Sequence, residues 1–344
     1  MRIALDAMGT DRHPAVEVEG AVQALRELPD DFTLVLVGQR ERIEAELDRF
    51  RDLPRDRLEV VHATQRIEQG ESPATAVRRK PNSSIVVGLQ MQKEGRVDAF
   101  VSAGSTGAVM AASLLILRPL PGVDRPPVGT VLPTAAEPIV LVDAGANVDS
   151  KPYHLVQFAR LGAIYAHDVL RRPNPRVGLL NIGEEPEKGD ELAVAAHRLL
   201  AQQSGLNFIG NVEGRDIITG GCDVLVADGF VGNVLLKFYE SIAAFFTGIL
   251  KREQEKSGAR MDLREIFAAL DYTEYGGAPL LGVNGISIIC HGGSPPRAIK
   301  SAIRVALRAV ATNMVGHMSR ELTTLPAADG DSIEPTVGRI AEGA

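Results

Sequence analysis

Residues 98–117, DAFVSAGSTGAVMAASLLIL, contain the pattern that decides the fold. A short apolar run from Asp98 to Ser102 ends at a glycine-rich turn, and a segment with helical periodicity follows from Thr106 to Leu117. This order predicts a strand, a turn and a helix. The three together are the repeating unit of a parallel sheet covered by helices.

The same unit recurs along the chain. Strands are expected at residues 2–6, 33–37, 58–62, 98–102, 139–143, 176–181, 223–228 and 286–291. Helices are expected at residues 14–28, 83–94, 106–117, 152–170, 188–203 and 295–317. Several of the strands are continuously apolar, which is typical of strands covered on both faces. The fold class predicted is therefore α/β, a three-layer α/β/α arrangement with a mostly parallel sheet.

The chain lacks internal repeats and Gly/Ser-rich linkers, so we predict a single α/β domain over residues 1–325. A helical excursion is expected at about residues 234–272. It begins with an apolar helix, Val234 to Leu250, and continues into a charged stretch, Lys251 to Arg264. Residues 326–344 are polar and without pattern, and we expect them to form a C-terminal tail.

Composition narrows the class of protein. The 344 residues are 45% hydrophobic, which is enough apolar material for a globular core. The net charge of −7 argues against a general nucleic-acid binder, because phosphate contacts need a basic surface. Two cysteines without CxxC spacing predict neither a disulfide framework nor a metal site. We expect a cytoplasmic protein, because Asp6 interrupts the first apolar run and the longest such run, Ala108 to Leu117, is too short to span a bilayer.

Familiar cofactor motifs are missing. No two glycines are separated by one residue, so the dinucleotide fingerprint GxGxxG cannot occur, and the Gly-Lys pair of the P-loop and the HExxH zinc motif are also absent. Ser105 is the closest approach to a nucleophile elbow, but its turn lacks the first glycine. No metal and no cofactor are predicted.

Polar residues and glycines follow most of the predicted strands, and open α/β sheets bind ligands at the carboxyl ends of their strands. The candidate ligand-binding residues are Asp6, Gly104, Ser105, Thr106, Gly107, Asn147, Asn181, Glu184, Lys188, Asp228, Asn233 and His291. For any single turn the alternative is structural, with glycine supplying an unusual φ and the polar side chain capping the next helix. Six such turns in one chain favour a binding site.

Three of these turns suggest particular chemistry. The turn from Ser102 to Ala108 opens a helix, where backbone N–H groups and the helix dipole favour an anion such as phosphate. Lys188 follows the acidic run Glu184-Glu185-Pro186-Glu187, which we expect to hold its ammonium group, although an ion pair at a helix start would look the same. His291 follows a strand and precedes two glycines, a position from which an imidazole could donate to an oxyanion or a leaving group.

Seven segments in order resemble the bacterial phosphate acyltransferase family, which forms acyl phosphate from acyl-acyl-carrier-protein and inorganic phosphate in phospholipid synthesis. They are residues 5–11 (LDAMGTD), 101–108 (VSAGSTGA), 125–133, 142–149 (VDAGANVD), 179–189 (LLNIGEEPEKG), 223–237 (DVLVADGFVGNVLLK) and 275–292. The resemblance implies a fold similar to the isocitrate and isopropylmalate dehydrogenases and to phosphotransacetylases. It also implies a homodimer, peripheral association with the inner face of the membrane, no nicotinamide, and a product passed to a glycerol-3-phosphate acyltransferase. Thr10, Ser105 and the charged excursion depart from the family pattern.

This chemistry needs little base catalysis, because phosphate is already an anionic nucleophile and a thiol with a pKa of about 8.5 is a tolerable leaving group. The enzyme chiefly has to position the reactants and stabilise an oxyanion. We therefore expect the Gly104 to Ala108 turn and Lys188 to bind phosphate, and Asn147, Asn181 and Asn233 to orient it. His291 or a backbone N–H would serve the oxyanion, and Asp6, Glu184 and Asp228 complete the predicted substrate-binding set.

An acidic carrier protein needs a basic landing surface. The candidates are Arg260 and Arg264 on the excursion, with Arg297, Lys300, Arg304 and Arg308 on the last helix. The last four are spaced three or four residues apart, which puts them on one helical face, although a merely solvated face would show the same spacing. Two other functions stay open: a phosphotransacetylase-like enzyme that uses acyl-CoA, and a non-catalytic scaffold that binds carrier protein or membrane.

Overall fold

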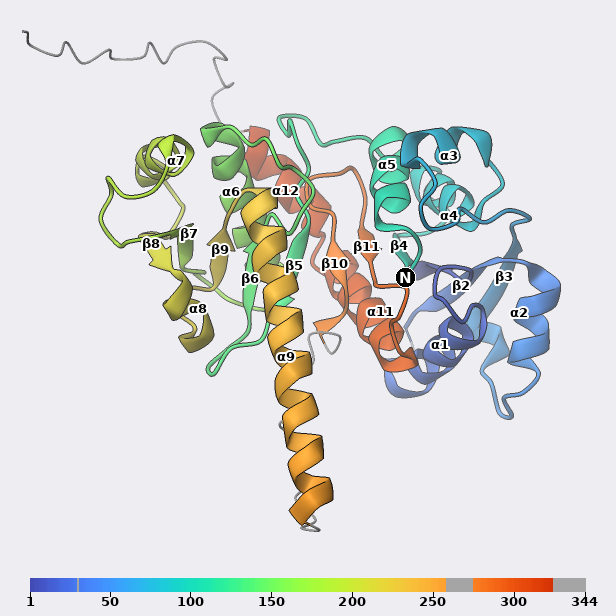
Figure 1. The fold of residues 1–344 in the computed structure, drawn as a ribbon. Coiled ribbons are helices and arrows are strands. Elements are labelled where there is room, and N and C mark those ends of the chain that lie inside the picture. Colours follow the sequence, from blue (N-terminus) through green and yellow to red (C-terminus); the bar gives the residue numbers. More distant parts are fainter. Residues whose placement is uncertain (30, 258–274, 324–344) are drawn as a thin grey trace, which may run out of the picture.

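The computed structural model describes residues 1–29, 31–257 and 275–323, and its strands form two sheets (Figure 1). The first sheet has the order β10-β11-β4-β1-β2-β3 and is parallel except for β10. Its strands are β1 (Arg2–Asp6), β2 (Thr33–Gly38), β3 (Leu58–His62), β4 (Ala99–Ser102), β10 (Ala278–Pro279) and β11 (Ser287–Ile289).

The second sheet has the order β5-β6-β9-β7-β8 and is parallel except for β5. Its strands are β5 (Gly129–Leu132), β6 (Ile139–Val142), β7 (Val177–Asn181), β8 (Phe208–Glu213) and β9 (Val224–Val226). The two antiparallel edge strands, β5 and β10, lie side by side and are linked by a bridge between Val128 and Leu280. The two sheets therefore meet along one seam.

Helices cover both faces of each sheet. Side chains that alternate along the strands fall into two separate buried apolar clusters, as a sheet with two covered faces requires. One cluster packs beneath α1 (Ala15–Glu27), α2 (Arg40–Leu47), α6 (Pro152–Asp168), α7 (Glu191–Ala201), α11 (Pro296–Ala311) and α12 (Met314–Thr323). The other packs beneath α3 (Pro73–Arg79), α4 (Ser84–Lys93), α5 (Thr106–Ile116), α8 (Gly214–Thr219) and the start of α9 (Gly229–Ser257). A short 3-10 helix, Arg55–Arg57, precedes β3.

The predicted α/β/α class is confirmed, and every strand predicted from the sequence is present to within about two residues at each end. The sequence did not indicate β5, β8, β10, α2, α3 or α8. Gly210 in β8 has a left-handed φ of 96°, and β10 has two residues, so neither offers a clear strand pattern. The division into two sheets also has no signature in the sequence.

Two predicted helices begin or end elsewhere. The helix expected from Lys188 begins at Glu191, because Asp190 caps it by accepting from the N–H of Ala193. The helix expected over residues 295–317 is broken after Ala311, where Asn313 adopts a left-handed φ of 51°. The predicted tail and the excursion beyond Ser257 lie outside the described residues.

Helix α9 is the long element that projects from the body in Figure 1. Its 26 residues from Gly229 to Gln254 are long and apolar enough to cross a membrane, by length and composition alone. Only a small part of this stretch is buried. Charged residues interrupt the apolar runs of α9. The longest apolar run of the sequence, Ala108 to Leu117, therefore lies in another helix.

Candidate functional site

The carboxyl edge of the first sheet is built around Asp6. The Asp6 carboxylate is buried and accepts from the Ser102 hydroxyl at 2.7 Å and from the N–H of Met8 at 2.9 Å. Burial raises its pKa, and the hydrogen bonds oppose that rise. The Ser102 oxygen in turn accepts from the N–H of Gly104 at 3.0 Å. Asp6 thus holds the β1 and β4 turns together, and its carboxylate has a structural task.

The β4 turn leads directly into α5, as the anion-cradle prediction requires. The first intrahelical bond runs from the N–H of Val109 to the carbonyl of Ser105. Among the described residues, none accepts from the N–H groups of Thr106, Gly107 and Ala108, and the Ser105 side chain does not cap the helix. Unpaired N–H groups at a helix start, in line with the helix dipole, form a site suited to an anion. That this anion is phosphate stays a prediction.

His291 lies two residues beyond β11, beside the same edge, where the carbonyl of Gly292 accepts from the N–H of Asp11 at 2.9 Å. Its Nε2 lies 3.5 Å from Oε1 of Glu240 on α9. Burial lowers the pKa of His291 although the Glu240 carboxylate works in the opposite direction, so the neutral imidazole is favoured. The Glu240 carboxylate beside Nε2 favours the tautomer with the proton on Nε2, so Nδ1 of the neutral imidazole is an acceptor.

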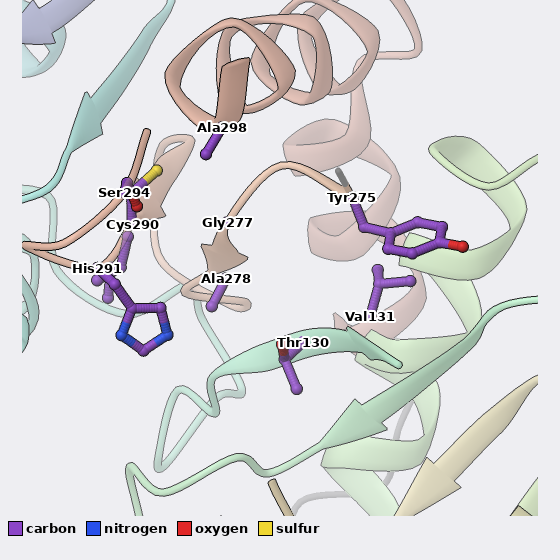
Figure 2. Close-up of a pocket in the computed structure, with 10 residues that line it drawn as sticks. Thr130, Val131, Tyr275, Gly277, Ala278, Cys290, His291, Ser294 and Ala298 are labelled. Atoms are coloured by element: carbon purple, nitrogen blue, oxygen red, sulfur yellow. The ribbon is translucent and has the colours of Figure 1, made fainter. Parts of the chain in front are cut away.

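His291 also lines a cavity at the seam between the sheets (Figure 2). Thr130 and Val131 on β5 form one side, and Ala278 on β10 and Ala298 on α11 form others. The cavity volume is about 30 Å³, which is room for about one water molecule. It is therefore too small to be the substrate site.

The second sheet carries the turn from Asp143 to Asn147 at its carboxyl edge. Asp143 is buried and accepts from several backbone N–H groups and from the Asn147 side chain at 2.9 Å. Gly229 packs on this turn and donates its N–H to the carbonyl of Asn147 at 2.8 Å. Asn233 lies beside Gly145 and is exposed, and its side chain has no hydrogen bond to any described residue. The predicted residues Asn147, Asp228 and Asn233 are thus brought together.

The β7 turn holds the other predicted residues of this edge. The Asn181 side chain donates to the carbonyl of Lys188 and accepts from the N–H of Ile182, so it closes the turn on itself. Lys188 is exposed and precedes the helix start. The expectation that the acidic run holds its ammonium group is wrong for the described residues: none pairs with it, and Glu184 lies 3.4 Å from Arg215 instead.

Helix α9 connects the two edges. Asn233 and Glu240, the residue beside His291, are seven positions apart on it, which is about 10 Å along the helix axis. Asn233 and His291 can therefore face one substrate of moderate length. Asp228 begins this helix by accepting from the N–H groups of Phe230 and Val231.

Comparison with known proteins identifies the family. The model of the family described as fatty acid synthesis protein matches residues 1–317. The phosphate acyltransferase of Desulforamulus reducens is 50% identical over 94% of this chain and 97% of its own length, and that of Heliobacterium modesticaldum is 50% identical over 94% and 98%. The chain belongs to the phosphate acyltransferase family.

The chain shares its fold with more distant proteins. The EutD phosphotransacetylase of Staphylococcus aureus superimposes with a TM-score of 0.58 over 90% of this chain and 94% of its own, at 16% identity. A 4-hydroxythreonine-4-phosphate dehydrogenase of Klebsiella pneumoniae gives 0.50 over 90% and 98%, also at 16% identity. At such identities the likeness concerns the fold alone, and it agrees with the predicted class.

The basic face predicted for carrier binding is present on α11. Arg297, Lys300, Arg304 and Arg308 are exposed or half-buried, whereas most other positions of the helix are buried. Lys300 pairs with Glu27 at 2.6 Å, which offsets part of its charge. Partial burial and the charges of Arg304 and Arg171 lower the pKa of Arg308, which reflects a concentration of positive charge. Arg260 and Arg264 lie outside the described residues.

Glu17 is a residue at the first edge that sequence reasoning missed. It is fully buried on α1, and its carboxylate accepts from the N–H of Thr10 at 2.6 Å and from the Thr10 hydroxyl at 2.9 Å. Burial raises its pKa to about 7, and the Asp6 charge adds to the rise. The available signal was its spacing of four residues from Ala21, which places it on the apolar face of the helix.

One group of side chains could hold a metal ion among the residues described. Ligand atoms of His167, Asp168 and His317 lie within 4.8 Å of one another. The Asp168 carboxylate hydrogen-bonds to both imidazoles, at 2.7 Å and 3.0 Å, which accounts for their convergence without an ion. The group lies at the end of α6 remote from the sheet edges.

Proposed function

We propose that this acyltransferase moves the acyl group of acyl-acyl-carrier-protein to inorganic phosphate, which yields acyl phosphate and free carrier protein. The observation that carries the proposal is the β4 turn, where unpaired N–H groups of α5 face the sheet edge. Identity of about 50% to phosphate acyltransferases over nearly the whole chain supports it.

The reaction is an acyl substitution. A phosphate oxygen attacks the thioester carbonyl carbon and a tetrahedral oxyanion forms. The carbon–sulfur bond then breaks, and the electron pair leaves with the thiolate, which takes a proton from solvent. The α5 N–H groups hold phosphate, and the exposed ammonium of Lys188 offsets the negative charge that gathers on the oxyanion. The Asn233 amide on α9 supplies a hydrogen-bond donor, and His291 or a backbone N–H serves the oxyanion.

The basic face of α11 is the landing surface for the acidic carrier protein. Arg297 lies in the first turn of α11, six residues after His291, so the face begins beside the first edge. A carrier docked there can extend its thioester toward the seam between the sheets. Complementary charge of this kind speeds association and weakens as salt is added.

We propose further that the enzyme is a homodimer on the inner face of the membrane and that its product passes to a glycerol-3-phosphate acyltransferase. The exposed apolar side of α9 supports the dimer and the membrane contact. Large apolar side chains repeat along its exposed side at spacings of three or four: Phe230, Val234, Phe238, Ile242, Phe245 and Phe246. A stripe of this size on a soluble surface calls for a covering partner. Light scattering of Phe238→Glu against the unchanged protein tests the dimer, and flotation with anionic lipid vesicles tests the membrane contact.

The deciding experiment measures thiol release from palmitoyl-carrier protein with and without inorganic phosphate, with mass-spectrometric detection of acyl phosphate. We expect release only with phosphate, and acyl phosphate as its product. Equal activity with palmitoyl-CoA would favour a phosphotransacetylase-like enzyme. A folded protein that binds the carrier without phosphate-dependent release would be a scaffold.

A further inference from the structure

A cavity of about 670 Å³ lies at the carboxyl edge of the second sheet, between the turns that follow β7 and β9. We infer that this cavity binds the fatty acyl chain of the substrate, an inference that rests on the proposed acyl transfer. The polar turn after β4 in the first sheet then binds phosphate. The acyl chain and phosphate therefore bind at the edges of different sheets.

The position of the cavity follows from the topology. The chain leaves β7 through α7 toward β8, on one side of the sheet, whereas it leaves β9 through α9 toward β10, on the other side. Neighbouring strands whose connections diverge leave a crevice between them, and open α/β sheets bind ligands there. The volume is within the range of about 300–1,000 Å³ that is usual for small-molecule sites.

The lining is apolar. Leu155, Leu179, Leu180 and Leu192 form much of its wall, and Val231 closes it on the α9 side. Ile182 also lines it and is 82% exposed, which is unusual for a large aliphatic side chain at a turn. An acyl chain that entered past Ile182 would cover this side chain, and each buried CH₂ group would be favoured by the hydrophobic effect.

The polar side chains of the lining are already committed. Asp190 and Asp228 accept from the first N–H groups of α7 and α9, and both polar atoms of Asn181 are used within its own turn. They offer little to a polar ligand, so we assign Asn181 and Asp228 to the wall of an acyl pocket instead of the phosphate site. Lys188 is exposed and directly precedes Gly189 of the wall, so this residue lies next to the rim, where the polar head of an acyl compound would remain.

The test narrows the cavity from the α9 side. Val231→Trp places a large ring in the lining, and Ala244→Trp is the matched control, because Ala244 lies on the same helix, is exposed, and belongs neither to the cavity lining nor to the apolar stripe of α9. Both variants are assayed with palmitoyl- and hexanoyl-carrier protein. We expect Val231→Trp to lower kcat/KM for the palmitoyl donor about tenfold or more and to change the hexanoyl value less than about twofold. Ala244→Trp should leave the ratio of the two unchanged.

A binding measurement makes the result independent of catalysis. Cis-parinaric acid, a fluorescent long-chain fatty acid, should bind the unchanged protein and Ala244→Trp, should be displaced by palmitate, and should bind Val231→Trp at least tenfold more weakly. Ala193→Leu, on the opposite wall, replaces Val231→Trp if that variant does not fold. Unchanged chain-length preference and unchanged parinarate binding in the cavity variants would overturn the assignment. Absence of phosphate-dependent release with either donor in the unchanged protein would instead overturn the proposed function, and the binding result would still decide on the cavity.

Discussion

The carboxyl edges of the two sheets differ in how tightly they are packed. At the first edge, a Cβ added to Gly9 would lie 2.6–2.8 Å from backbone atoms of Ala103 and Gly104, so the β1 and β4 turns touch. At the second edge, a Cβ added to Gly214 would meet nothing within 4 Å, and a cavity of about 670 Å³ is open. Contact between backbones fixes the positions of N–H donors, whereas open apolar space admits a long flexible group.

Both edges have the same topological origin. The chain leaves β1 toward β2 and leaves β4 toward the second sheet, so the connections diverge there just as they do between β7 and β9. Glycine and a buried Asp6 close the first crevice, and leucines line the second. The two crevices share one topology, and they suit different ligands because different residues line them.

The largest effect is expected from breaking the packed edge. Gly9→Ala should lower the free energy of unfolding by at least about 3 kcal/mol and abolish activity, because the new methyl group meets backbone that cannot move aside. Gly214→Ala should leave stability unchanged or raise it by up to about 1 kcal/mol, because the site is open and alanine favours helix. Urea unfolding of both variants checks the contrast. Equal destabilisation would mean that the edges do not differ in packing.

Glu17 links the packed edge to pH. Its pKa is raised to about 7 from an ordinary value of 4.5, so the folded protein binds this proton more tightly than the unfolded chain does. The contribution to stability is greatest below pH 4.5 and is lost as pH rises to about 7, a change of about 3 kcal/mol. Glu17→Gln should remove this decline, while the buried Asp6, whose pKa is also raised, keeps its own contribution of the same sign.

Urea unfolding at pH 5 and pH 8 measures this decline. Glu17→Gln should flatten the difference, and Glu19→Gln on the same helix, which is exposed, should not. The same pH dependence in Glu17→Gln and the unchanged protein would show that Glu17 ionises normally in the folded state. The packed edge would then contain a charged carboxylate beside the Thr10 turn.

Much of this contrast could be predicted from the sequence. Continuous apolar runs and glycine-rich turns indicated the parallel strands and both sets of edge residues, because strand periodicity and turn chemistry are local properties. The cavity at the β7–β9 crevice could not be found, since Leu155, Leu180 and Val231 are distant in sequence and meet only through tertiary packing. The surroundings of His291 and Lys188 were not predicted for the same reason. Glu240 lies beside His291 because of the course of α9, and Arg215 takes the place beside Glu184 that was expected for Lys188.

Lys188 tests the open edge. Because its ammonium is exposed and has no described partner, Lys188→Ala should cost little stability but should lower kcat/KM for acyl transfer about 100-fold through lost charge stabilisation. Lys188→Arg should recover part of the activity, and Glu187→Gln, on the same turn and exposed, should change it less than about twofold. The checks are steady-state kinetics and thermal unfolding. A change of less than about twofold in Lys188→Ala would remove this residue from the reaction.

The smallest effect is expected at the basic face of α11, which lies outside both crevices. Arg304→Glu with Arg308→Glu should raise KM for the acyl carrier about tenfold and leave KM for phosphate unchanged, because charge reversal repels an acidic protein but does not touch the phosphate turn. The effect should shrink as the salt concentration rises from about 50 to about 300 mM. The distance over which exposed charges act on one another is about 10 Å near 0.1 M and falls as salt is added. Arg198→Glu on α7, also exposed, is the matched control and should change neither constant. If the charge reversals on α11 and on α7 raised KM for the acyl carrier equally, the net charge of the protein would determine carrier binding and the position of the charges would not. The carrier would then have no defined docking site on α11 from which to reach the two edges.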